Sequence, residues 1–137
     1  MSTSRVAAVL AGLWAGMLLC IALVATPATF AMLFPADAGR VVGRIFSVEA
    51  YTSLTLALVL ITLERRRSEQ AMSATVMLLL GAAFCTVAGY FAVQPMMAGA
   101  RAGQGSLSFG TLHAISLGFF ALKGFLVLGV AWRLAPR

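Results

Sequence analysis

The sequence predicts an all-α protein that spans a membrane as a bundle of four helices, and its composition and charge spacing support this fold class. Of the 137 residues, 61% are hydrophobic and only 10% are charged, whereas a typical soluble domain has about 25% charged residues. Three long stretches carry no charged side chain, and they lie between Arg5 and Asp37, between Glu69 and Arg101, and between Arg101 and Lys123. Each stretch is longer than the roughly 18 apolar residues that mark a membrane-spanning helix.

Four apolar segments give the expected helices, at about residues 6–33, 44–63, 71–94 and 109–132, and we treat residues 1–137 as one domain. Because backbone polar groups in lipid must bond within their own segment, each span should be helical. The first span is longer than a hydrocarbon core of about 30 Å requires. We expect Pro27 to kink it, because the proline ring removes the hydrogen bond to the Leu23 carbonyl. Pro95 is expected to end the third helix in a similar way.

Two connections have a distinct composition. Residues 34–40 are expected to form a turn followed by a short interfacial helix, with Asp37 near its start, where the helix dipole favours an anion. Residues 98–108 are rich in glycine and serine, which is typical of a mobile loop. Neither segment is long enough to act as a domain of its own.

The basic residues predict the orientation of the four spans. An even number of spans places both termini on one side of the membrane, together with six basic residues: Arg5, Arg65, Arg66, Arg67, Arg133 and Arg137. The opposite side carries Arg40, Arg44 and Arg101. Because basic residues favour the cytoplasmic side, we expect both termini in the cytoplasm and the first and third connections outside. The formal charge of +6 is therefore read as an orientation signal, and no nucleic-acid partner is expected.

Small residues recur four positions apart in two of the spans. The first span has Gly12, Gly16 and Cys20, and the third has Gly81, Cys85 and Gly89. Such spacing places small side chains on one helix face and lets helix backbones approach closely in lipid. We therefore interpret helices one and three as close packing elements. The two cysteines are interpreted as small packing residues, with a copper(I) dithiolate as the alternative.

Polar side chains within the apolar spans are the candidate binding residues, because ionisable groups in a bilayer are costly and usually face the bundle interior. At about 100° per residue, each of helices two, three and four aligns its polar positions on one face. If the three faces converge, they line an outward-facing cleft. The candidates are Glu49, Tyr90, Gln94, His113, Ser116 and Lys123. We expect Glu49, Tyr90, Gln94 and His113 at the mouth of this cleft and Lys123 at its floor.

Each ionisable candidate also has a simpler interpretation. His113 could form only a hydrogen bond between helices. Lys123 could extend its ammonium group to the cytoplasmic interface. Glu49 could serve the N-terminal end of its helix and pair with Arg40 or Arg44.

A metal site is the second possibility for the same end of the bundle. The candidate ligands are His113, Met32, Met96 and Met97, because imidazole and thioether groups suit copper(I). The alternative is that the methionines fill gaps in the packing. The chain has a single histidine, which argues against a haem held by two histidines.

Four segments, taken in order, resemble the bacterial members of the family named after transmembrane protein 205. They are residues 26–30 (TPATF), 38–46 (AGRVVGRIF), 94–95 (QP) and 109–116 (FGTLHAIS). The resemblance covers nearly the whole chain and implies a small multi-pass protein of the bacterial inner membrane, with no settled activity. More distantly, the chain is similar to the copper-resistance membrane domain and to the four-helix protoporphyrinogen oxidase. The oxidase has a histidine in its first helix, which this chain lacks.

Together these observations predict a membrane protein that binds a small ligand or metal ion in an outward cleft, as a transport or resistance protein would. The alternative is an assembly protein whose small-residue helix faces pair with a partner or with a second copy of the chain. A membrane redox enzyme is the third reading, disfavoured because the sequence has no evident nucleophile, multi-histidine site or nucleotide-binding loop.

Overall fold

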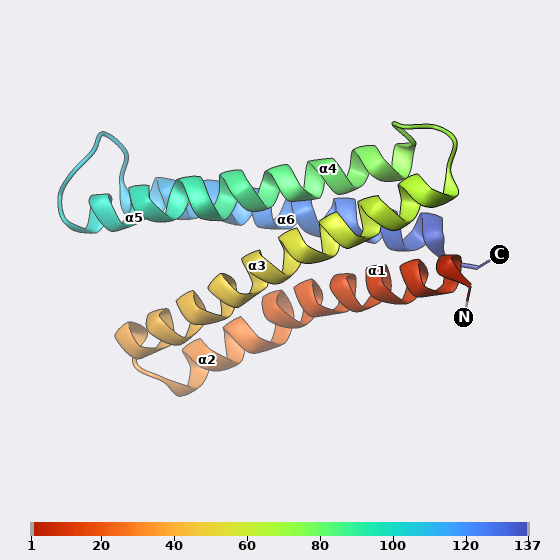
Figure 1. Ribbon diagram of the computed structural model, residues 1–137. Coiled ribbons are helices and arrows are strands. Elements are labelled where there is room, and N and C mark those ends of the chain that lie inside the picture. Colours follow the sequence, from red (N-terminus) through yellow and green to blue (C-terminus); the bar gives the residue numbers. More distant parts are fainter. Residues whose placement is uncertain (1, 137) are drawn as a thin grey trace.

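The computed structural model describes residues 2–136, and within this range every regular element is helical. The helices form four long rods, and Figure 1 shows that successive rods run in opposite directions along the bundle. The first comprises α1 (Thr3–Cys20), η1 (Ile21–Ala25) and α2 (Thr26–Met32), and the second is α3 (Pro35–Arg67). The third comprises α4 (Ala74–Thr86), η2 (Val87–Ala92) and α5 (Val93–Arg101), and the fourth is α6 (Phe109–Leu134). The all-α prediction is confirmed, and all four rods are long and apolar enough to cross a membrane.

Local sequence signals set the helix ends. Pro35 occupies the first turn of α3, where its missing N–H is not needed, and Asp37 lies in the same turn. Ser73 and Ser108 precede α4 and α6, and each side-chain oxygen accepts a hydrogen bond from the backbone N–H three residues later. The connection before α6 contains Gly103 and Gly105, both with positive φ angles that favour glycine.

Two expected helix boundaries are wrong. Residues 34–40 do not form a turn and a separate interfacial helix. Phe34 is the N-cap of α3 and the residues from Pro35 onward are its first turns, because Pro35 is compatible with a helix start and nothing after it breaks the hydrogen-bond ladder. The third rod does not end near residue 94 but continues through Pro95 to Arg101.

Pro27 and Pro95 each follow a π-helical turn, which explains how the first and third rods continue through them. η1 ends two residues before Pro27, and the N–H of Thr26 bonds to the Ile21 carbonyl five residues earlier. η2 likewise ends shortly before Pro95. A proline removes one i→i−4 hydrogen bond, and a widened turn upstream changes the register of the ladder so that the helix can resume. Such turns are also frequent at functional sites.

Each rod packs against its neighbours in chain order, and α1 also packs against α6, which closes the bundle. The helices α1 and α4 therefore lie diagonally opposite, and their small-residue faces do not pack against each other. The third span instead uses its glycines against α6, where a Cβ added to Gly89 would lie 2.6 Å from Phe119 Cβ. Gly12 and Gly16 are exposed, with open space where a Cβ would be.

The main hydrophobic core occupies the half of the bundle that holds both termini. Its buried members come from α1, α3, α4 and α6, and they include Trp14, Leu18, Leu60, Leu79 and Val127. At the other end, α2 packs with the start of α3, and α5 packs with the start of α6, but the two pairs share no such core. Figure 1 shows α2 and the start of α3 lying apart from α5.

Large apolar side chains cover the outer surface of the bundle. Leu13, Leu23, Phe125 and Trp132 are all well exposed. A soluble monomer rarely exposes such a continuous apolar surface, whereas lipid tails would contact it favourably. The chain is therefore a multi-pass membrane protein.

We predict that the end holding both termini (Figure 1) faces the cytoplasm. In a background with Cys20→Ala and Cys85→Ala, a membrane-impermeant maleimide should label Gln104→Cys in intact spheroplasts, because residue 104 lies in the exposed connection before α6. Gln70→Cys, at the opposite end, should react only after the membrane is permeabilised. The reverse labelling pattern would show that the termini face outward.

Candidate functional site

A cavity of about 460 Å³ lies between the two helix pairs at the end away from the termini. All four rods line it. It begins at the helix ends, where Pro35, Arg101 and Phe109 lie, and reaches as far as Glu49 and Lys123. Phe109 and Lys123 are 14 residues apart on α6, so the cavity extends over about 21 Å of helix.

A buried ion pair forms the floor of the cavity. Lys123 Nζ on α6 lies 2.6 Å from Glu49 Oε1 on α3, and the side chains are only 3% and 2% exposed. The pair therefore joins two helices that are diagonal in the bundle. Lys123 Nζ also lies 5.1 Å from the centre of the Phe120 ring, and Phe120 meets Phe46 of α3 edge to face.

Two hydrogen bonds connect the ion pair to α1. Ser53, one turn after Glu49 on α3, donates to the same oxygen, Oε1. Trp14 Nε1 on α1 donates to Ser53 Oγ at 2.9 Å. Three rods are thus tied together at one depth, and Glu49 Oε1 accepts hydrogen bonds from two donors.

The walls contain further polar groups, and only some of them have partners. Ser116 Oγ on α6 donates to the Gly89 carbonyl in η2 at 2.9 Å. Thr86 Oγ1 donates to the Ala82 carbonyl within its own helix. Thr26 Oγ1, at the start of α2, is buried without a partner among the described residues. One unpaired hydroxyl therefore lies in the wall of the cavity.

The mouth is formed by side chains from α5 and α6. The Arg101 guanidinium lies 4.5 Å from the centre of the Phe109 ring. The same ring stacks with His113, with 5.9 Å between the ring centres and 15° between their planes. Phe109 therefore contacts both a guanidinium and an imidazole at the entrance.

All six candidate binding residues line this one cavity: Glu49, Tyr90, Gln94, His113, Ser116 and Lys123. The alternative interpretations of the two charged residues are wrong. Lys123 does not extend to the interface, because Glu49 holds it in the interior. Glu49 pairs with neither Arg40 nor Arg44, because α3 begins well before residue 44 and places Glu49 deep in the bundle, at the floor and not the mouth.

The weaker metal and cysteine candidates are not gathered in one place. His113 and Met97 line the cavity, but Met96 lines a separate pocket and Met32 is 82% exposed. Cys85 lines the cavity, whereas Cys20 is exposed and does not. Within residues 2–136, no three His, Cys, Asp or Glu side chains are grouped as they would be to hold a metal ion.

The sequence did not identify three residues that belong to the site: Trp14, Thr26 and Arg101. Trp14 carries no sign of its bond to Ser53, because the two residues meet only through the packing of α1 on α3. Thr26 could have been found from the sequence, because it directly precedes Pro27 and a proline marks a place where a helix is irregular. Arg101 counted only as a loop charge, because the third helix was expected to end before it.

The ion pair leads to a stability prediction. Glu49→Ala should lower the free energy of unfolding by about 3–5 kcal/mol, because it leaves the Lys123 ammonium group buried without a partner. The double variant Glu49→Gln, Lys123→Met should recover most of this loss, because it removes both charges. Thermal denaturation of the purified protein in detergent measures both effects.

Glu64→Gln is the matched control for this measurement. Glu64 pairs with Arg67 at 3.5 Å near the end of α3, where the arginine side chain is exposed. The Arg67 side chain keeps its contact with solvent, and a glutamine amide can still accept the hydrogen bond that Ser73 donates to Glu64, so Glu64→Gln should change the melting temperature little. Equal losses for Glu49→Ala and Glu64→Gln would contradict a structural role for the buried pair.

Comparisons with known proteins identify a family but no activity. Residues 9–106 match the family described as a domain of unknown function, DUF4149, and the matched part runs from α1 to the connection before α6. No curated protein and no solved structure matches the chain. The narrower resemblance to the transmembrane protein 205 family stays a prediction. Because the matched residues make up more than half of the sequence, the chain belongs to the DUF4149 family.

Proposed function

We propose that this protein binds a small ligand in the cavity between its two helix pairs. The observation that carries the proposal is the meeting of polar side chains from three rods around one cavity with a buried ion pair at its floor. In the sequence these side chains are separated by up to 74 residues. We place the cavity mouth on the periplasmic side of a bacterial inner membrane, on the evidence of the basic residues and the family resemblance.

The size and composition of the cavity fit a small molecule. Ligand sites are usually cavities of roughly 300–1,000 Å³, mostly apolar, with a few polar groups in defined positions. This cavity has a volume of about 460 Å³, and apolar side chains such as Phe46 and Phe120 alternate with polar ones. A bound molecule would therefore meet both apolar surface and hydrogen-bonding groups.

Polar groups of the walls remain available for such a molecule. Among the described residues, Tyr90, Gln94 and His113 form no side-chain hydrogen bond, and Thr26 Oγ1 is buried without one. An unpaired polar group in an apolar environment costs free energy that water or a ligand can recover. These groups are the donors and acceptors that a ligand would use.

The ion pair also fits a functional role better than a purely structural one. A buried ion pair is often no more stabilising than apolar side chains of similar volume, because desolvation offsets the attraction. Charged residues within spans tend to mark substrate or ion pathways. At the floor of a cavity, Glu49 and Lys123 would set the depth to which a ligand enters.

Assembly through small-residue helix faces is the second candidate function. Gly12 and Gly16 on α1 are exposed with open space around them, so a second helix could approach closely there. The glycines of the third span are already used against α6 within the chain. The experiment described next therefore includes a variant of Gly12 on α1 and measures the mass of the intact assembly, which shows whether the chain forms an oligomer.

A pair of glycine-to-tryptophan variants tests the two functions together. Gly43 lines the cavity and has open space at its Cβ position, so Gly43→Trp should place its indole in the cavity with no clash at Cβ. Gly12 has similar open space but does not line the cavity, so Gly12→Trp is the matched control. Native mass spectrometry in a non-ionic detergent would titrate each protein with three amphiphiles built on a ten-carbon chain: decanol, decanoate and decyltrimethylammonium.

We expect at least one amphiphile to saturate at one molecule per chain. Binding should be preserved in Gly12→Trp and weakened at least tenfold in Gly43→Trp, because the indole would occupy the same space as the probe. If none of the three saturates, or if Gly43→Trp binds as well as the natural protein, the cavity is not a binding site. An oligomer in the natural protein that Gly12→Trp dissociates would instead favour assembly.

A further inference from the structure

We propose that the ligand of this cavity is an anionic amphiphile, with its acidic head at the mouth beside Arg101 and its apolar chain directed toward the floor. The inference rests on the proposed binding function and adds the chemical class of the ligand. It is carried by the charge distribution of the cavity, by the contacts of Arg101, and by the apolar surface between mouth and floor.

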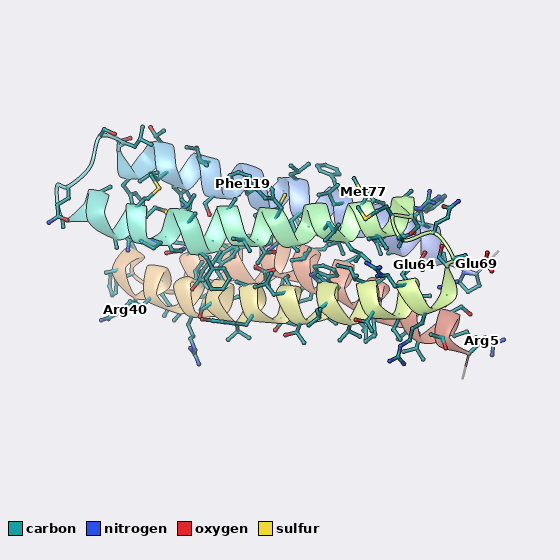
Figure 2. All side chains as sticks on the ribbon, turned by 45° about the horizontal axis from the view of Figure 1, so that its top comes forward. Arg5, Arg40, Glu64, Glu69, Met77 and Phe119 are labelled. Carbon is teal, nitrogen blue, oxygen red and sulfur yellow. The ribbon has the colours of Figure 1, made fainter. Side chains whose placement is uncertain are left out.

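Within residues 2–136, the positive charge of Arg101 at the mouth has no carboxylate partner. The chain has only four acidic residues. Asp37 pairs with Arg40, Glu49 with Lys123 and Glu64 with Arg67. Figure 2 shows Glu64 and Glu69 at the end of the bundle opposite the mouth. No carboxylate in the described part of the chain therefore lies within ion-pair distance of Arg101.

The contacts of Arg101 hold this free charge at the entrance. Its guanidinium lies over the Phe109 ring, which also stacks with His113. A planar guanidinium can donate two parallel hydrogen bonds to a carboxylate or a phosphate, and its stacking on an aromatic ring limits the freedom that binding must remove. His113, which stacks on the same Phe109 ring, supplies a further hydrogen-bonding group at the mouth. The mouth is therefore suited to an acidic head group.

The floor is less suited to the head, although it also contains a cation. Lys123 Nζ is already 2.6 Å from Glu49 Oε1, and together the two side chains are neutral. An anion at the floor would have to displace Glu49 and lose the solvation that it keeps at the mouth. The free positive charge of the cavity lies at its entrance, and an acidic head should remain there.

Between mouth and floor the lining is largely apolar. Phe30 comes from α2, Val42 and Phe46 from α3, and Leu117 and Phe120 from α6. These side chains offer contact surface for a hydrocarbon chain, whose burial contributes about 0.8 kcal/mol per CH₂ group. A small polar anion without a chain would leave this surface unused.

The same arrangement matches the way an amphiphile lies in a bilayer. The mouth is at the ends of α3, α5 and α6, where the rods reach the membrane surface, and the floor lies deep within the spans. A molecule that enters from the surrounding lipid would keep its head near the surface and its chain in the interior. Two sources share this chemistry: free fatty acids, which have a carboxylate, and lipids that have a phosphate head.

The experiment compares probes of equal chain length that differ only in the head group. Native mass spectrometry in a non-ionic detergent would measure the affinities of decanoate, decyl phosphate, decanol and decyltrimethylammonium for the purified protein. We expect decanoate or decyl phosphate to bind at least tenfold more tightly than decanol, and decyltrimethylammonium to bind most weakly. Tighter binding of decanoate would favour fatty acids as the source, and tighter binding of decyl phosphate would favour lipids with a phosphate head.

Arg101→Gln tests whether the charge at the mouth is responsible. This variant should lose the preference for the acidic probes, so that decanoate and decyl phosphate bind no more tightly than decanol. Arg44→Gln is the control, because Arg44 is an exposed arginine on α3 that does not line the cavity. Its preference for acidic probes should be unchanged.

The outcomes separate this inference from the function on which it rests. If decanol or decyltrimethylammonium binds as tightly as the acidic probes, and Gly43→Trp abolishes that binding, the cavity is a binding site but the anionic class is wrong. If Arg101→Gln keeps the full preference, the proposed position of the head group is wrong. If no probe saturates, the binding function itself fails.

Discussion

The buried ion pair between Glu49 and Lys123 is the interaction on which the rest of the structure depends. Each charge in the centre of a span costs roughly 2.5–3.5 kcal/mol on insertion scales, so the helices must pack in a way that brings the two together. This requirement restricts the rotation of α3 and α6 about their axes. Ser53 and Trp14 extend the restriction to α1 through two further hydrogen bonds. The pair also marks the boundary between a packed half of the bundle and a hollow one.

The two halves differ because only one of them has a core shared by all four rods. Toward the termini, large apolar side chains such as Leu18, Leu60 and Leu79 interlock. Toward the other end, α2 and α5 each follow a π-helical turn and each pack mainly with the rod next to them in the chain. Residues in or directly after these turns, among them Thr26 and Tyr90, line the cavity. The backbone irregularities and the candidate site thus occur at the same level.

Much of the site could be predicted because helical spacing is a local property. Tyr90 and Gln94 are four residues apart and so share a helix face, as do Glu49 and Ser53. The helix ends were harder to predict. The segment with Gly39, Arg40 and Gly43 is less apolar than a typical span, yet it is the start of α3, because a helix can extend beyond the hydrocarbon region into the interface.

The sequence by itself determined that lipid surrounds most of this protein, how many spans it has and on which helix face each polar side chain lies. These properties follow from sums over neighbouring residues: hydropathy along a segment, charge at its ends and the period of the helix. Only the tertiary structure decided that Glu49 pairs with Lys123, that Trp14 reaches Ser53, and that Gly12 remains exposed while Gly89 contacts α6. Those contacts depend on the relative depth and rotation of rods far apart in the chain, which are set by how side chains fill the space between helices.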